Sequence, residues 1–109
     1  MINHVVLFKL KDYPANEKAQ VISELKSMLE GLQEKITEVK FIEVGANYEI
    51  NSNSYDLALI SYFESVEDLD AYRVHPEHQK VVKRIAETTS ERAAVDYYFP
   101  ETLSPLDKE

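Results

Sequence analysis

The sequence predicts a single α+β domain of ferredoxin-like, split βαβ type, in which two helices cover one face of a four-stranded antiparallel sheet. Apolar runs and helical periodicity alternate along the chain in the order strand, helix, strand, strand, helix, strand. The 109 residues, 44% of them hydrophobic, suit one core and leave no room for a second domain. We therefore expect one domain over residues 1–99, followed by a tail over residues 100–109.

At the amino end, the pattern predicts a strand followed by a helix. Residues 2–11 alternate as a strand does and carry apolar side chains on both sides in the middle, and Pro14 lies in the break that follows. Residues 16–34 have apolar side chains at three- and four-residue steps, which is typical of an amphipathic helix. Its apolar stripe consists of Val21, Ile22, Leu25, Met28, Leu29 and Leu32.

The middle of the chain predicts two strands with a loop between them. Residues 39–44 form the expected second strand, and it ends at Gly45, where we expect a backbone conformation that a side chain would strain. The polar residues 51–54 predict a loop. Residues 55–63 follow as the third strand, and they are too uniformly apolar to have one face in water.

Local signals divide the second helix in two. Ser65, with Asp68 three residues later, predicts the start of the helix. Pro76 would clash with the carbonyl four residues earlier, so the helix is expected to stop near Val74 and to restart with Pro76 in its first turn. The restarted helix is followed by the last strand, at residues 92–99.

The second face of the sheet needs a cover of its own. Two short helices screen one face, yet the strands are apolar on both. The uncovered side is expected to expose a patch larger than monomers tolerate, made of Val5, Leu7, Leu57, Leu59, Phe63 and Val95. A second copy of the chain is the economical cover, so the sequence predicts a homodimer whose two sheets form a dimeric α/β barrel.

Composition excludes several classes of protein. The chain has no cysteine, which excludes disulfides, thiolate metal sites and cysteine nucleophiles. Its formal net charge of −8, with the basic residues scattered, argues against nucleic acid as a partner. No apolar run approaches the length of a membrane span, so we expect no membrane association and a cytoplasmic location.

Four stretches of the sequence occur together in an informative order. They are HVVLFKLK at residues 4–11, VGAN at 44–47, YDLAL at 55–59 and AYRVHPEH at 71–78. Together they resemble the stress-responsive α/β-barrel domain family, often called Dabb, over nearly the whole chain up to Phe99. The resemblance implies a ferredoxin-like fold and a homodimeric barrel, which agrees with the expectation from periodicity.

The resemblance also implies site residues. Most members of the family have no known biochemical role, with stress association in plants, and a few cyclise polyketide chains without a cofactor. In those cyclase-like members a histidine and a tyrosine of the second helix act on the substrate, and they match His78 and Tyr72. The first-strand histidine, which matches His4, lines the same cavity. Leu57 stands where the cyclase-like members have a histidine, so this sequence departs from the cyclase pattern there.

The spacing of these residues by itself has two interpretations. Tyr72, His75 and His78 are three residues apart, which makes them neighbours on a helix, and with His4 they offer acid–base groups that work near neutral pH. Alternatively, His75 caps the restarted helix while His78 and Tyr72 are hydrogen-bonded core residues. No carboxylate completes a recognisable ligand set with the histidines, so we expect neither a metal nor a cofactor.

The sequence therefore predicts a protein that binds a small apolar or aromatic molecule between sheet and helices, with cofactor-independent acid–base chemistry. His78 and Tyr72 are the candidate catalytic residues, and His4 and His75 are the candidate substrate-binding residues. Two alternatives stay open: a non-catalytic dimeric structural or stress protein, and, by analogy with related dimeric barrels, a haem-binding or monooxygenase-type protein.

Overall fold

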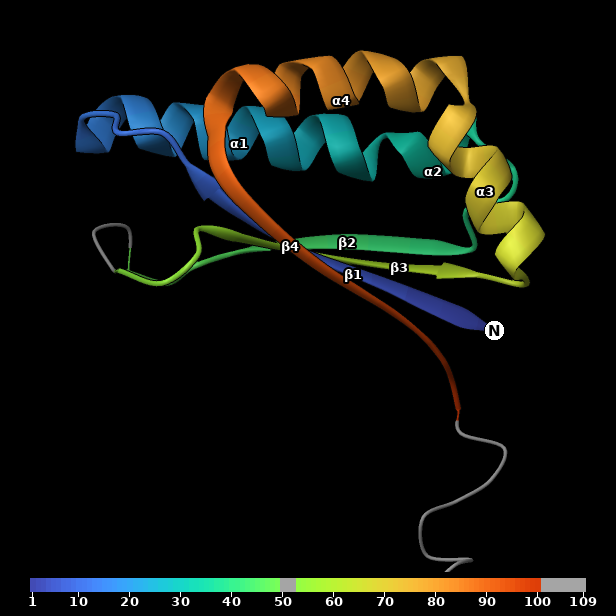
Figure 1. Ribbon diagram of the computed structural model, residues 1–109. Coiled ribbons are helices and arrows are strands. Elements are labelled where there is room, and N and C mark those ends of the chain that lie inside the picture. Colours follow the sequence, from blue (N-terminus) through green and yellow to red (C-terminus); the bar gives the residue numbers. More distant parts are fainter. Residues whose placement is uncertain (50–52, 101–109) are drawn as a thin grey trace, which may run out of the picture.

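Four antiparallel strands form one sheet in the computed structural model, and the helices lie on one of its faces (Figure 1). The structure describes residues 1–49 and 53–100. In chain order the elements are β1 (Ile2–Leu10), α1 (Ala15–Glu30), α2 (Leu32–Lys35), β2 (Phe41–Ala46), β3 (Leu57–Phe63), α3 (Val66–Val74), α4 (Pro76–Thr88) and β4 (Thr89–Tyr98). The strand order is β2-β3-β1-β4. This confirms the predicted α+β, ferredoxin-like fold, although β4 begins three residues earlier than expected.

Both predicted helical segments contain a break. Gly31 separates α1 from the single turn of α2, and His75 separates α3 from α4. Ser65 Oγ accepts a hydrogen bond from the Asp68 amide at 3.1 Å, and Pro76 occupies the first position of α4, which confirms the start and the interruption expected from the sequence. The break places Tyr72 near the end of α3 and turns α4 back over the sheet.

The core lies between the helices and one side of the strands. Val6 of β1 pairs with Leu59 of β3, and because side chains alternate along a strand, Leu57, Leu59 and Phe63 all face the helices. All three are at most 2% exposed, so the expectation that they lie on the uncovered face is wrong. Neighbouring positions on both strands are apolar, and only the pairing register decided which set became the core.

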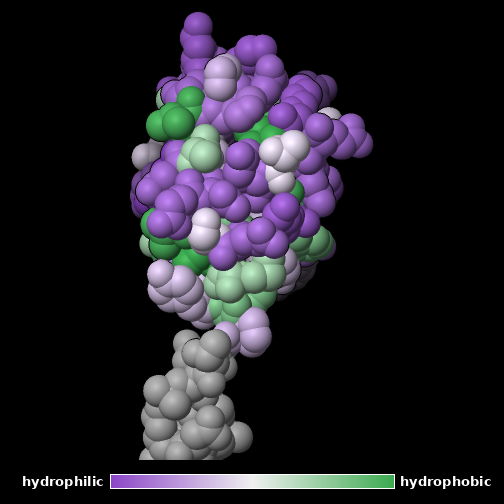
Figure 2. Space-filling model, turned by 90° about the vertical axis from the view of Figure 1, so that its right-hand side faces the viewer, coloured by the Kyte–Doolittle hydropathy of each residue, from purple (hydrophilic) through white to green (hydrophobic). Residues whose placement is uncertain are grey.

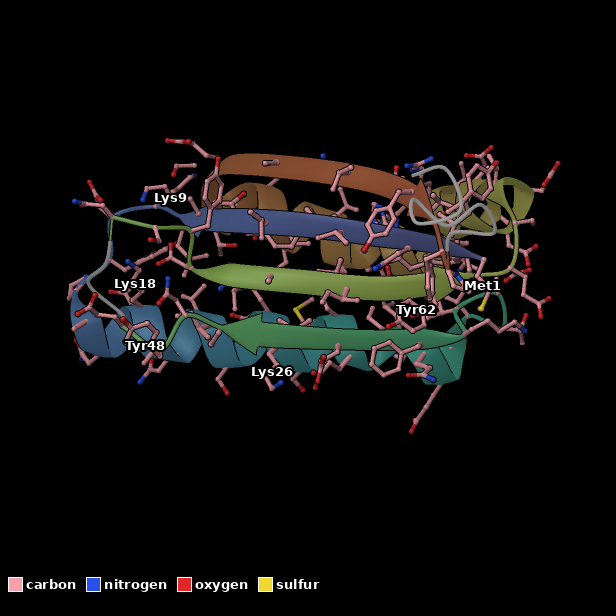
Figure 3. All side chains as sticks on the ribbon, turned by 90° about the horizontal axis from the view of Figure 1, so that it is seen from below. Met1, Lys9, Lys18, Lys26, Tyr48 and Tyr62 are labelled. Atoms are coloured by element: carbon pink, nitrogen blue, oxygen red, sulfur yellow. The ribbon has the colours of Figure 1, made fainter. Side chains whose placement is uncertain are left out.

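The other face of the sheet has no cover within the described residues. Val5 and Leu7 of β1 and Val95 of β4 lie there, as predicted, and Val95 is 55% exposed. Figure 3 looks onto this face from below and shows Tyr62 on it. Its further apolar and aromatic side chains are Phe41, Ala58, Ile60, Ala93 and Tyr97. Figure 2 shows hydrophobic residues gathered toward the sheet side of one end, below a hydrophilic surface over the helices. We call the uncovered face of the sheet, opposite the helices, the open face.

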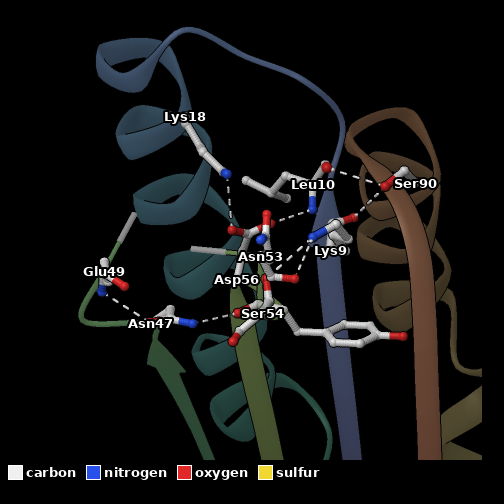
Figure 4. Close-up of polar contacts among 10 residues, drawn as sticks. Lys9, Leu10, Lys18, Asn47, Glu49, Asn53, Ser54, Asp56 and Ser90 are labelled. Atoms are coloured by element: carbon white, nitrogen blue, oxygen red, sulfur yellow. Dashed lines mark hydrogen bonds and ion pairs between the residues drawn. The ribbon is translucent and has the colours of Figure 1, made fainter. Parts of the chain in front are cut away.

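A buried carboxylate joins the helix layer to the end of the sheet (Figure 4). Asp56 is 3% exposed, and its carboxylate accepts a hydrogen bond from the Leu10 amide at 2.7 Å and lies 3.1 Å from the Lys18 ammonium of α1. The register of β1 against β4 shifts between Lys9 and Leu10, so the Leu10 amide is satisfied by a side chain instead of the ladder. The carboxylate therefore replaces a backbone acceptor at an irregular strand end.

Gly45 does not behave as predicted. It lies within β2, no glycine has a positive φ, and a Cβ added at Gly45 would meet nothing within 4 Å. The position is extended and lies on the open face, so a side chain there would not strain the chain. Of the expected tail, residues 101–109 lie outside the described residues. Within residues 1–49 and 53–100, none of the helices combines the length and the apolar character needed to cross a lipid bilayer.

Candidate functional site

A cavity of about 300 Å³ lies between the sheet and the helices. Its walls come from β1, β3 and β4 on one side and from α1, α3 and α4 on the other. The lining residues are His4, Val6, Phe8, Leu29, Leu59, Arg73, His78, Val82, Ile85, Ala86, Thr89 and Arg92. Most of the lining is apolar, with a few polar groups that converge from different elements, which is typical of a site for a small organic molecule.

His4 enters this cavity from β1. It shares the helix-facing side of the strand with Val6 and is 5% exposed. Asp96 is its register partner on β4, and the distance from His4 Nδ1 to Asp96 Oδ1 is 2.5 Å. The second carboxylate oxygen of Asp96 accepts a hydrogen bond from Arg73 Nη2 at 2.8 Å. The sequence did not point to Asp96, because it lies 92 positions from His4 and only the pairing of β1 with β4 brings the two residues together.

These contacts assign the proton on His4. Burial favours a neutral Asp96, but the hydrogen bonds from His4 and Arg73 and the charge of Arg73 oppose it, and the pKa of this carboxyl lies below its usual value. A carboxylate only accepts hydrogen bonds, so His4 Nδ1 carries the proton and Nε2 has the free lone pair. Burial lowers the pKa of His4 more than Asp96 raises it, which keeps the imidazole neutral near pH 7.

His78 reaches the same cavity from the first turn of α4. Its Nδ1 lies 3.1 Å from the carbonyl oxygen of Arg73, which can only accept, so Nδ1 carries the proton here too. Burial lowers the pKa of His78 more than this hydrogen bond raises it. Two neutral imidazoles, each with Nδ1 engaged and Nε2 available to a ligand, therefore line one cavity.

Tyr72 packs behind the two histidines. Its ring centroid is 4.2 Å from that of His78, 4.9 Å from that of Phe63 and 6.3 Å from that of His4. Tyr72 is 0% exposed and does not line the cavity. Its hydroxyl has no hydrogen-bond partner among the described residues, and burial raises its pKa, so the phenol is protonated.

His75 is not part of the cavity lining. Its Nδ1 accepts a hydrogen bond from the Glu77 amide at 3.1 Å and so caps α4. The structure thus brings His4, Tyr72 and His78 together and places His75 at the helix start, where the alternative interpretation of the sequence put it. No cluster of three or more histidine, aspartate or glutamate side chains suited to a metal ion occurs within residues 1–49 and 53–100.

Two arginines in the lining were also missed from the sequence. Arg73 comes from the last turn of α3 and Arg92 from β4, opposite Phe8 of β1. Arg73 lay inside the recognised stretch at residues 71–78, but a helix position alone does not show that its side chain reaches a strand. Arg92 would have been suspected only from the alternation of the last strand, which places it on the same side as Asp96.

Comparisons with known proteins agree with this architecture. A family model described as the stress-responsive A/B barrel domain matches residues 2–99. Over 96% of its length the chain is 31% identical to the stress-response A/B barrel domain-containing protein DABB1 of Arabidopsis thaliana. It covers 51% of that protein and 41% of a second Arabidopsis protein named for the same domain, so it spans about half, or less, of these curated relatives.

Solved structures resemble the chain over most of its length. A dimeric protein of unknown function with a ferredoxin-like fold from Bacteroides fragilis has a TM-score of 0.82 and 41% identity, covering 90% of this chain and 95% of that one. A dimeric ferredoxin-like protein of unknown function from Thermobifida fusca has a TM-score of 0.75 and 26% identity, covering 90% of each chain.

Proposed function

The chain belongs to the family of stress-responsive A/B barrel domains, and on that premise we propose that it binds a small apolar or aromatic molecule in the cavity and moves a proton on it. The observation that carries the proposal is the pair of neutral imidazoles, His4 and His78, in one largely apolar cavity. Each has Nδ1 engaged by a fixed acceptor, which orients the ring and directs the basic Nε2 to a ligand.

The proposed chemistry is removal of a proton from a carbon next to a carbonyl group. The C–H bond breaks, the proton passes to an imidazole Nε2, and the electron pair moves into the carbonyl to give an enolate. Asp96 stabilises the imidazolium that forms at His4, because its carboxylate already accepts the Nδ1 proton. At His78 a neutral carbonyl takes that place, so we propose His4 as the stronger base.

We propose a positioning role for Tyr72 in place of direct proton donation. Its ring packs against both imidazoles, which limits their rotation, whereas its hydroxyl lies outside the cavity lining. His75 acts through α4, since its cap fixes the turn that carries His78.

We also propose that two copies of the chain pair through their open faces. Val5, Leu7 and Val95 lie on this apolar surface, and both of the structural relatives described above are dimeric. Association through this face leaves the cavity untouched, because the cavity lies on the opposite side of the sheet. Assembly alone, without chemistry, is the competing function.

Proton exchange in D₂O tests the proposal and separates it from assembly alone. We would incubate the protein with small aromatic ketones such as phenylacetone and follow loss of the α-hydrogen signals by NMR. The protein should accelerate exchange, and His4→Gln and His78→Gln should each reduce that acceleration by about a hundredfold or more, which is the range expected of a general base. His75→Asn is the matched control: it removes an imidazole outside the lining but retains a side chain that caps helices well, so exchange should persist.

Two outcomes would count against the proposal. If both histidine variants, folded and dimeric, retained full exchange, the imidazoles would not be the bases. If the wild-type protein neither bound nor exchanged any ketone tested, the assembly function would be the better account.

A further inference from the structure

Building on the proposed cavity, we propose that its ligand is an organic anion, a carboxylate attached to an apolar or aromatic body, and that the Arg92 guanidinium binds the anionic group. This names the class of molecule that the site selects, and it adds a binding residue to the two histidines. The inference rests on the charges in the lining, the pairing of each arginine and the distance along β4.

The charged residues in the cavity lining are opposite in sign to the net charge of the chain. The protein has 20 acidic and 12 basic residues, yet the formally charged residues in the lining are Arg73 and Arg92, with no carboxylate among them. Both arginines are exposed to solvent as well as lining the cavity, and their positive charges attract an anion toward it. The lining therefore favours a negatively charged ligand even though the whole protein repels one.

The two arginines are not equivalent. Arg73 already donates to Asp96 at 2.8 Å and to Asp70 at 3.1 Å, so its charge is compensated by two carboxylates. The Arg92 guanidinium makes no hydrogen bond or ion pair within residues 1–49 and 53–100, although it lies on the cavity side of β4. Its planar fork of donors is free to bind a carboxylate through two parallel hydrogen bonds.

The separation along β4 indicates the shape of the ligand. Arg92 and Asp96 lie on the same side of the strand, four residues or about 13 Å apart, and Asp96 marks the position of His4. Val6 lies between these ends on β1, Phe8 lies opposite Arg92, and Ile85 of α4 adds to the apolar lining. A ligand with its carboxylate at Arg92 would place its apolar body against this lining and its far end toward His4.

The alternative without a ligand is that the charge of Arg92 only protects the exposed edge strand β4 from aggregation. It requires no preference of the cavity for anions and no effect of Arg92 on any ligand. A pair of probes that differ only in charge separates the two accounts.

The probes are 2-naphthoate and its neutral amide, 2-naphthamide, titrated into the full chain while the methyl signals of Val6 and Ile85 are followed by NMR. Naphthoate should bind about tenfold or more tightly than the amide, a difference of about 1.4 kcal/mol. Arg92→Gln should abolish this preference and leave amide binding unchanged. Arg84→Gln is the matched control, because Arg84 is paired with Glu24 and Glu87 outside the lining, and the preference should persist. Arg92→Lys, which retains charge without the fork, should give an intermediate preference.

Each result bears on the inference. Equal affinity for acid and amide in the wild-type protein would overturn anion selection. A preference that survives in Arg92→Gln would overturn the assignment of the anionic group to Arg92. In both cases the proposed cavity stands, because the methyl shifts would still report binding. If neither probe shifts those methyl signals, the cavity does not bind aromatic molecules of this class, and both anion selection and that part of the proposed function fail.

Discussion

Removing the hydroxyl of Tyr72 should make the protein more stable. The side chain is 0% exposed, and its oxygen has no hydrogen-bond partner among the described residues. A buried hydroxyl without a partner costs about 1–3 kcal/mol, and the small void left by the oxygen offsets part of the gain. We therefore expect Tyr72→Phe to raise the free energy of unfolding by about 1 kcal/mol.

Tyr97→Phe is a control in which the same atom is removed with the opposite result. The Tyr97 hydroxyl accepts a hydrogen bond from Asn3 Nδ2 at 2.9 Å, and its loss should lower the free energy of unfolding by about 0.5–1 kcal/mol. Urea unfolding at one fixed protein concentration measures both variants, because the stability of a dimer depends on concentration.

The result that would refute this reasoning is a Tyr72→Phe variant less stable than the parent by more than about 0.5 kcal/mol, a loss typical of a broken hydrogen bond. The same variant also tests the positioning role of Tyr72. Its ring is retained, so α-hydrogen exchange should be unchanged, and a loss of exchange of about tenfold at undiminished stability would show that the hydroxyl acts on the ligand.

Three further predictions concern the fold, its pH dependence and its assembly. Asp56→Ala should lower the free energy of unfolding by about 3 kcal/mol, and Asp56→Asn should lower it by less, because the asparagine side-chain oxygen still accepts a hydrogen bond from the Leu10 amide. An exposed site such as Glu87→Gln should lose no more than ~0.5 kcal/mol, and a loss from Asp56→Ala as small as that would contradict the prediction. The pKa of His78 is lowered in the folded state, so on acidification the unfolded chain binds the proton first. Stability should therefore fall as the pH drops below about 6.5 and continue to fall until the folded-state pKa is passed. His78→Gln should flatten this slope in urea unfolding measured between about pH 7 and pH 5, and an identical slope would be evidence against a neutral, partly buried His78. In sedimentation equilibrium the wild-type protein should have a mass of twice 12.6 kDa. Val95→Glu should shift the equilibrium toward monomer, whereas Val74→Glu, on α3, should stay dimeric. A wild-type protein that is a stable monomer at micromolar concentration would disprove pairing through the open face.

Local chemistry was sufficient to predict the elements and their order. Ser65 with Asp68 sets the start of α3, and Pro76 after Val74 sets the boundary between α3 and α4, through hydrogen bonds and clashes within a few residues. The approximate positions of the strands followed from alternation and from apolar runs. These features depend on near neighbours in the chain, so the sequence contains them directly, as it does the resemblance that the family match confirmed.

The sequence determined that both sides of β3 are apolar, but only the tertiary structure decided that Leu57, Leu59 and Phe63 pack under the helices. The two-residue alternation along a strand shows which residues share a side, but it does not show which side is covered. The same limit applies to the site: His4 and Asp96 are 92 positions apart, and β1 and β4 bring them together only once they pair. Arg92 reaches the cavity for the same reason, since contact between distant strands depends on register, which is a property of the folded sheet and not of either segment alone.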